Sequence, residues 1–318
     1  MSIKLPCTYK QASSLFVAAF SLFAAVPQAA IAMEFLTSVD PGGCVLEHVA
    51  VDPETRQFQV DSLSADGNKI VIGWDRESGE RGTHILDLQT GERTAVPGFN
   101  NGGVFSPDGK TLVNSIYIEG GKTNIAELDL ATGSMTLIAP DPQWDWLASY
   151  SSDGQTILFN SYRRDGDSDI YTYDKNSEEL KRWTEYDGYE AHGQFSPDDS
   201  KILFHRLQGE NDFNVFVIDV ASGDITQLTD DPTEEGYASW SPDAKWIVFS
   251  SDRGRSKGVT DLYLMNLESK ELRQLTNLDE KDAYPFFSPD GKYVYFNSNR
   301  APEGVYRITL DDELQCVK

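Results

Sequence analysis

The chain has 318 residues, with 51 acidic and 27 basic side chains and a formal net charge of −24 at pH 7. Such an excess of negative charge repels phosphate backbones and anionic membranes, so we expect no nucleic-acid partner. The length suits either two domains or one large β domain, and the repeat described below decides between them.

Residues 1–32 have the pattern of a secretory signal peptide. Basic residues precede an apolar stretch from Ala12 to Val26, and the small-residue site Ala30-Ile31-Ala32 follows it. The stretch is too short to cross a membrane as a stable helix, and Cys7 lies before it, where a lipid-modified cysteine would lie after it. We therefore expect cleavage near Met33, no membrane insertion of the mature chain, and a periplasmic or secreted location. A retained anchor is the alternative.

Two cysteines remain after such cleavage, Cys44 near one end and Cys316 near the other. Because export places them in an oxidising compartment, we predict that they form a disulfide, with two free thiols as the alternative. In the chain-entropy model, closing so long a loop would contribute roughly 5 kcal/mol to stability.

A short cassette recurs along the rest of the chain. It has the form Ser-Pro-Asp-Gly or a close variant and begins at Ser64, Ser106, Ser151, Ser196, Ser241 and Ser288. These serines are 42, 45, 45, 45 and 47 residues apart. In an all-β context, a period in the forties indicates a four-stranded blade repeated around a propeller.

Each repeat predicts four strands. A large apolar residue precedes the cassette and marks the end of a short inner strand before a tight turn. The next run, for example TILFNS or WIVFSS, is apolar without alternation, as expected for a strand covered on both faces. A third strand such as DIYTYD follows, and a glycine-containing turn then leads to an outer strand such as DITQLT.

These features predict an all-β fold, a six-bladed β-propeller of four-stranded antiparallel blades over residues 58–318. We expect the blades to begin near Phe58, Asn100, Asp145, Glu190, Glu235 and Asp282. Residues 33–57 are too few for another blade, so we expect Cys44 to Val51 to add a closing strand to the last blade. Such closure covers apolar faces and strand edges that an open ring would expose. The alternative is that the C-terminal segment LQCVK closes this blade alone.

The order SPDG, apolar strand, S-x-R, D-I-Y and L-T resembles the repeat of TolB-like β-propellers, and it covers nearly the whole predicted mature chain. The resemblance implies the fold more than the function. The same repeat occurs in binding proteins, in propeller domains of peptidases and in certain pectin-fragment lyases. TolB itself has an α/β domain before its propeller. This chain has no room for that domain, so the resemblance does not imply a direct role in the Tol system.

An arginine recurs twelve residues after the cassette serine, at Arg76, Arg163, Arg253 and Arg300, with Arg206 two positions early in another repeat. These arginines accompany the cassette aspartates Asp66, Asp153, Asp243 and Asp290. We predict that the two sets form charge-assisted hydrogen bonds that tie blades or turns together.

Six residues before the cassette serine, four repeats carry a carboxylate: Asp145, Glu190, Glu235 and Asp282. A propeller places this position at one mouth of its central channel. A ring of carboxylates there would suit a cation such as calcium or a basic peptide segment, whereas side chains that only solvate the rim are the alternative. Aromatic side chains typical of interfaces and sugar sites lie nearby, namely Trp144, Trp146, Tyr189, Tyr237 and Tyr284.

Signals for catalysis are weak. The sequence contains no G-x-S-x-G elbow, phosphate loop or dinucleotide fingerprint, and its four histidines lack metal-ligand spacing. His192 alone falls on a predicted innermost strand, where a histidine is more often packed or hydrogen-bonded than catalytic. We therefore expect no cofactor beyond the cation considered above, whose ligands are unknown.

From these features we expect an exported, monomeric binding module that captures a protein segment or a saccharide at the acidic and aromatic mouth of the channel. The alternative is a carbohydrate- or peptide-processing enzyme, a lyase or hydrolase, that uses the channel carboxylates with His192. A scaffold in an envelope assembly is a third hypothesis.

Overall fold

The computed structural model describes residues 35–50, 57–75, 79–99, 102–164, 166–210 and 212–317. The predicted signal peptide, Arg76 and Asn100 lie outside the described residues. Across the described ranges the chain forms strands and turns without any helix, so no helix in them is suited to cross a membrane.

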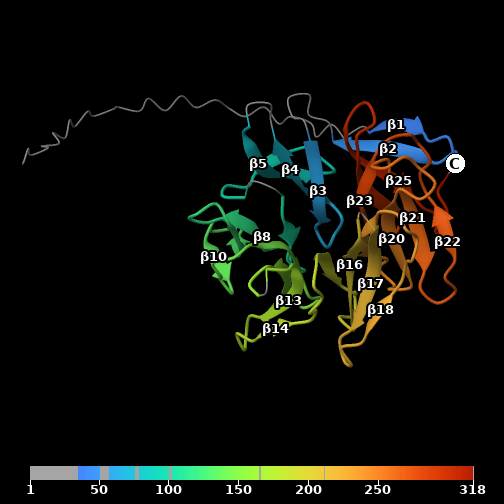
Figure 1. Cartoon of the computed structure of the whole chain (residues 1–318). Coiled ribbons are helices and arrows are strands. Elements are labelled where there is room, and N and C mark those ends of the chain that lie inside the picture. Colours follow the sequence, from blue (N-terminus) through green and yellow to red (C-terminus); the bar gives the residue numbers. More distant parts are fainter. Residues whose placement is uncertain are drawn as a thin grey trace, which may run out of the picture. The chain divides into compact units, whose positions relative to one another are not determined.

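Six antiparallel sheets are arranged as the blades of a propeller, which confirms the predicted all-β fold (Figure 1). The first strand of each blade contacts the first strands of both neighbouring blades. These strands therefore form the inner ring, and the other strands follow outward.

Blades 1 to 3 follow one another along the chain. Blade 1 consists of β3 (Gln57–Leu63), β4 (Lys69–Asp75), β5 (Arg81–Asp87) and β6 (Arg93–Ala95). Blade 2 consists of β7 (Val104–Phe105), β8 (Thr111–Tyr117), β9 (Thr123–Asp129) and β10 (Met135–Ile138). Blade 3 consists of β11 (Asp145–Tyr150), β12 (Thr156–Ser161), β13 (Asp169–Asp174) and β14 (Leu180–Arg182).

Blades 4 and 5 repeat this order, and blade 6 combines both ends of the described chain. Blade 4 consists of β15 (Glu190–Phe195), β16 (Lys201–Gly209), β17 (Asp212–Asp219) and β18 (Ile225–Gln227). Blade 5 consists of β19 (Glu235–Trp240), β20 (Trp246–Ser251), β21 (Asp261–Asn266) and β22 (Leu272–Gln274). Blade 6 consists of β23 (Asp282–Phe287), β24 (Tyr293–Ser298), β25 (Gly304–Thr309), β2 (Val45–Ala50) and β1 (Leu36–Val39).

The hydrophobic core lies between the blades. Buried apolar residues form a cluster at each blade interface. Between blades 4 and 5, for example, Leu203 packs with Ile247 and Phe249. The second strands are buried on both faces, as the lack of alternation predicted: Ile157, Leu158 and Phe159 of β12 are all 0% exposed.

The cassette forms a turn that satisfies its own polar groups. Ser64 Oγ donates a hydrogen bond to Asp66 Oδ1 (2.6 Å) and accepts one from the N–H of Lys69 (2.9 Å). The same serine–aspartate pair recurs in each of the other cassettes. Because the cassette aspartates bond within their own turns, they are not the partners of the recurring arginines that the structure describes. The predicted tying role of these arginines is confirmed with other partners: Arg163, for example, bonds to Asp145 and to the carbonyl of Ala139 in the preceding blade.

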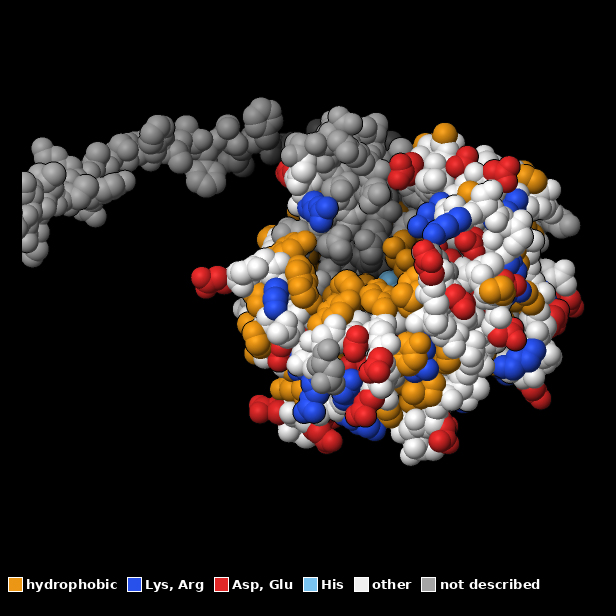
Figure 2. All heavy atoms as spheres, viewed as in Figure 1, with side chains coloured by type: hydrophobic (Ala, Val, Ile, Leu, Met, Phe, Trp, Pro, Cys, Tyr) orange, Lys and Arg blue, Asp and Glu red, His pale blue; other side chains and the backbone are white. Residues whose placement is uncertain are grey.

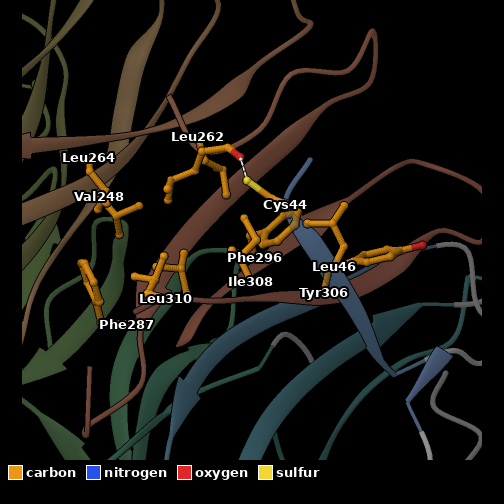
Figure 3. Packing of buried hydrophobic residues seen from close by; sticks show 12 residues of the cluster. Cys44, Leu46, Val248, Leu262, Leu264, Phe287, Phe296, Tyr306, Ile308 and Leu310 are labelled. Atoms are coloured by element: carbon orange, nitrogen blue, oxygen red, sulfur yellow. Dashed lines mark hydrogen bonds between the residues drawn. The ribbon is translucent and has the colours of Figure 1, made fainter. Parts of the chain in front are cut away.

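Blade 6 is closed by the N-terminal segment. β2 pairs antiparallel with β25, with Leu46 opposite Ile308, and so supplies the fourth strand. Cys44 and Cys316 form the predicted disulfide, with their α-carbons 5.3 Å apart. Figure 3 shows Cys44 and Leu46 among core residues of blades 5 and 6. The closing strand is therefore fixed by backbone pairing, by apolar packing and by a covalent bond.

Candidate functional site at the mouth of the central channel

Each of the predicted carboxylates begins the first strand of its blade, and each side chain is completely buried. Asp145, Glu190, Glu235 and Asp282 are all 0% exposed. An arginine within or just after the second strand of the same blade pairs with each of them. The pairs are Arg163 with Asp145 (3.0 Å), Arg206 with Glu190 (2.6 Å), Arg253 with Glu235, and Arg300 with Asp282.

This pairing changes the expected chemistry of the ring. Burial raises the pKa of Glu190 and of Glu235, and the neighbouring arginine partly opposes that increase. Each carboxylate of the ring is therefore paired within the protein, and the pairs tie the first strand to the second in blades 3 to 6.

Two residues after each carboxylate, the backbone adopts the left-handed conformation. The φ angles are 52° at Leu147, 56° at His192, 54° at Tyr237 and 56° at Tyr284. A β-bulge interrupts the pairing with the second strand at the same point in all four blades. The left-handed conformation costs a residue with a Cβ about 1–2 kcal/mol, and bulges commonly redirect a side chain near functional sites.

The redirected side chains of blades 4, 5 and 6 meet one another. The ring centroid of Tyr237 lies 4.7 Å from that of His192 and 4.3 Å from that of Tyr284. The rings of His192 and Tyr284 are 6.0 Å apart although their blades are not neighbours. Such a contact requires both side chains to lie at the centre of the ring of blades, in the mouth of the channel. Figure 2 shows hydrophobic side chains gathered around a central hollow, with a histidine visible among them.

A pocket of about 210 Å³ lies beside this cluster, between blades 4 and 5. Its lining residues are Tyr189, His205, Leu207, Phe213, Glu234, Gly236 and Tyr237. The rings of Tyr189 and Phe213 are perpendicular, with centroids 5.9 Å apart. Trp146 of blade 3 contacts Tyr189 at 5.8 Å and extends the aromatic surface to the next blade.

His205 forms a buried wall of the pocket. Its Nδ1 accepts a hydrogen bond from the N–H of Tyr237 (3.3 Å), which joins blade 4 to blade 5. A Cβ on residue 236 would lie 2.8 Å from this nitrogen, so the position of His205 requires Gly236.

Burial shifts the pKa values of the histidine and tyrosine side chains at the pocket toward their neutral forms. Burial lowers the pKa of His192 to about 3, and burial with the nearby His192 lowers the pKa of His205 well below its usual value. Burial also raises the pKa of Tyr237, with smaller contributions from Tyr284 and Glu234. Glu234 is the carboxylate-bearing side chain among the lining residues that the structure describes.

The structure brings together most of the aromatic residues predicted from the sequence. Trp146, Tyr189, His192, Tyr237 and Tyr284 form one chain of ring contacts through His205. Trp144, in contrast, is 39% exposed and lies just before β11.

Sequence reasoning missed His205, Phe213 and Glu234. His205 pairs with Ala191 across the β15–β16 hairpin, next to His192. A symmetrical count outward from the cassette turn places His205 opposite His192, so this signal was present in the sequence; the bulge moves the pairing by one residue, to Ala191. Among the described residues, no group of three or more His, Cys, Asp and Glu side chains is arranged to hold a metal ion.

Comparison with known proteins gives one family and many similar folds. The model of the TolB β-propeller domain family (PD40) matches residues 55–252. TolB from Acinetobacter baumannii is similar, with a TM-score of 0.65 and 23% identity over 80% of this chain and 66% of that chain. This chain therefore spans just under two thirds of the length of that TolB.

Two further structures match over more of their own length. A putative TolB from Agrobacterium tumefaciens has a TM-score of 0.63 and 23% identity, over 76% of this chain and 89% of that chain. An oligogalacturonate lyase in complex with manganese has a TM-score of 0.58 and 19% identity, over 89% of this chain and 98% of that chain. At these identities the likeness shows the fold alone.

Proposed function

The chain belongs to the TolB β-propeller domain family, and from this premise we propose that it is an exported binding module that captures a protein segment at the aromatic mouth of its channel. The pocket between blades 4 and 5 is the observation that carries this proposal. Its walls are formed by Tyr189, Phe213 and Tyr237, and aromatic side chains in such pockets supply much of the binding energy of protein interfaces.

The backbone at the mouth supports a binding role. His192, Tyr237 and Tyr284 are held in a left-handed conformation that favours glycine. The buried ion pairs directly before these residues fix the start of each strand. Strain that the surrounding structure maintains is typical of sites where side chains must be presented in one orientation.

The size of the pocket favours a protein segment over a saccharide. Its volume of about 210 Å³ is below the roughly 300–1,000 Å³ of pockets that enclose a whole drug-sized ligand. It suits one side chain of a longer ligand. The adjoining rings, from Trp146 to Tyr284, offer a surface for the neighbouring residues of that ligand.

The same geometry weakens the enzyme hypothesis. The channel carboxylates are buried in ion pairs with arginines, and His192 has a pKa of about 3. A general acid or base works best when its pKa lies near the working pH. We therefore favour binding over a lyase or hydrolase reaction.

Export to the periplasm or the medium is part of the proposal. The segment 1–32 has the signal-peptide pattern, and the disulfide between Cys44 and Cys316 suits an oxidising compartment.

The test is to select peptides from a displayed library for binding to the exported, processed protein. The same protein is assayed in parallel on a glycan array. We expect peptides that bind the native protein and bind the Phe213→Ala variant much more weakly. Ile225→Ala is the matched control, because Ile225 is an exposed apolar residue on the outer strand of the same blade. Peptides that bind Phe213→Ala as well as native protein, or ligands found only on the glycan array, would overturn the proposal.

A further inference from the structure

The sequence Glu234-Glu235 places two adjacent carboxylates in different environments. Glu235 is completely buried and pairs with Arg253. Glu234 lines the pocket, is only partly buried, and forms no ion pair with any described lysine or arginine. One carboxylate is thus neutralised within the protein, and the other faces the space that a ligand would occupy.

The position of Glu234 is fixed by its backbone. Its N–H donates a hydrogen bond to Asp252 Oδ1 (2.8 Å), and its carbonyl accepts one from the N–H of Asp252 (3.2 Å). A parallel β-bridge joins Glu234 to Phe213 of blade 4. The bridge holds the carboxylate-bearing residue directly beside one aromatic wall of the pocket.

The aromatic walls suit a positive charge. The rings of Tyr189 and Phe213 meet at 85°, and those of His205 and Phe213 meet at 63°. These rings line the pocket, and the negative face of an aromatic ring attracts ammonium and guanidinium groups. His192 and His205 are neutral, so no charge on these rings repels a cation.

We propose that this pocket receives a lysine or arginine side chain of the bound protein segment, with Glu234 as the counter-ion and Tyr189, Phe213 and Tyr237 around the alkyl stem and charged head. This inference rests on the proposed function and specifies the partner as a basic segment. The formal net charge of −24 favours approach of such a segment at low salt.

The test uses small probes whose binding to the exported protein is followed by NMR. The charged probes are Nα-acetyl-lysine amide and Nα-acetyl-arginine amide. The uncharged controls are Nα-acetyl-norleucine amide and the lysine probe acetylated on Nε. We expect the charged probes to bind roughly tenfold more tightly than the uncharged ones, and to weaken as salt rises from about 50 mM to about 500 mM.

The matched variants separate pocket charge from total charge. Glu234→Gln should remove the preference for charged probes, whereas Glu268→Gln should keep it. Glu268 is exposed in the turn between the outer strands β21 and β22 of the same blade, so the control changes the net charge equally.

Two results would overturn the inference: equal affinity of native protein for charged and uncharged probes, or an unchanged preference in Glu234→Gln. The first comparison needs no variant, so a folding defect in Glu234→Gln would not prevent a decision. Failure of the proposed function looks different, because peptides from the selection would then bind independently of Phe213.

Discussion

The guanidinium of Arg206 donates a hydrogen bond from Nε to Glu190 Oε1 (2.7 Å), and its Nη2 lies 2.6 Å from the same oxygen in an ion pair. The arginine also lies over the rings of Tyr186 (4.5 Å) and Phe216 (4.6 Å). Glu190 is completely buried. Glu190, which the sequence predicted to lie at the open mouth of the channel, is therefore a buried structural residue.

Replacing Arg206 with methionine should be strongly destabilising. The change leaves Glu190 buried without its cation, and breaking a buried ion pair from one side typically costs about 3–5 kcal/mol. We expect the free energy of unfolding, measured in urea, to fall by roughly that amount. The double variant Arg206→Met with Glu190→Leu should recover more than half of the loss. A single variant as stable as native protein would show that the pair does not hold the blade.

Asp169 should make the protein more stable at mildly acidic pH than at neutral pH. This carboxylate is completely buried beside Arg182, and burial raises its pKa from 3.8 to about 6, against the opposing effect of the arginine. The folded state then binds the proton more tightly than the unfolded state. The contribution is complete below pH 3.8 and is lost as the pH rises through about 6.

The corresponding measurement is the free energy of unfolding between about pH 4 and pH 7, where Asp169 should contribute a decrease of roughly 3 kcal/mol. Other buried carboxylates, such as Glu190 and Glu235, add to the slope with the same sign. Asp169→Asn cannot titrate at this position, so its curve should be flatter. Parallel curves for the variant and native protein would count against the raised pKa.

The disulfide should stabilise the closed ring. It joins cysteines 272 positions apart, and the chain-entropy model gives roughly 5 kcal/mol for a loop of this length. We expect reduction, or the double variant Cys44→Ala with Cys316→Ala, to lower the unfolding free energy toward that extent. Native-like circular dichroism should remain without denaturant, because β2 still pairs with β25. Equal stability of the oxidised and reduced protein would contradict this prediction.

Gly236→Ala should weaken ligand binding, although the substitution removes no side chain that contacts the ligand. The added methyl group would lie 2.8 Å from His205 Nδ1, so this wall of the pocket must shift. We expect peptides from the selection to lose at least tenfold in affinity, measured by calorimetry. Gly223→Ala is a useful comparison, because it strains a turn (φ +80°) outside the pocket lining, where a Cβ meets nothing within 4 Å, and so reports a general loss of stability. Equal losses in both variants would indicate a general effect on folding.

The blades and the disulfide could be predicted from the sequence alone. The spacing of the cassettes predicted the blades because each cassette is a local turn, closed by hydrogen bonds such as Ser64 to Asp66. The sequence also predicted the disulfide, because Cys44 and Cys316 are the two cysteines outside the predicted signal peptide.

The partners of the arginines and the extent of the pocket required the structure. Arg206 reaches Glu190 across a hairpin whose register is shifted by the bulge at His192. The pocket combines Tyr189, Phe213 and Glu234 from two blades, and no local pattern links residues that far apart in the chain. The sequence located the mouth through its aromatic residues but gave no sign that its carboxylates were already paired.

The most direct test of binding at the mouth is the ¹³C NMR spectrum of tyrosine-labelled protein with a saturating peptide from the selection, assigned by single Tyr→Phe variants. We predict that the resonances of Tyr189, Tyr237 and Tyr284 shift, while that of Tyr263, buried between blades 4 and 5 away from the pocket lining, stays in place. Unchanged resonances of all three mouth tyrosines with the peptide fully bound would contradict the account.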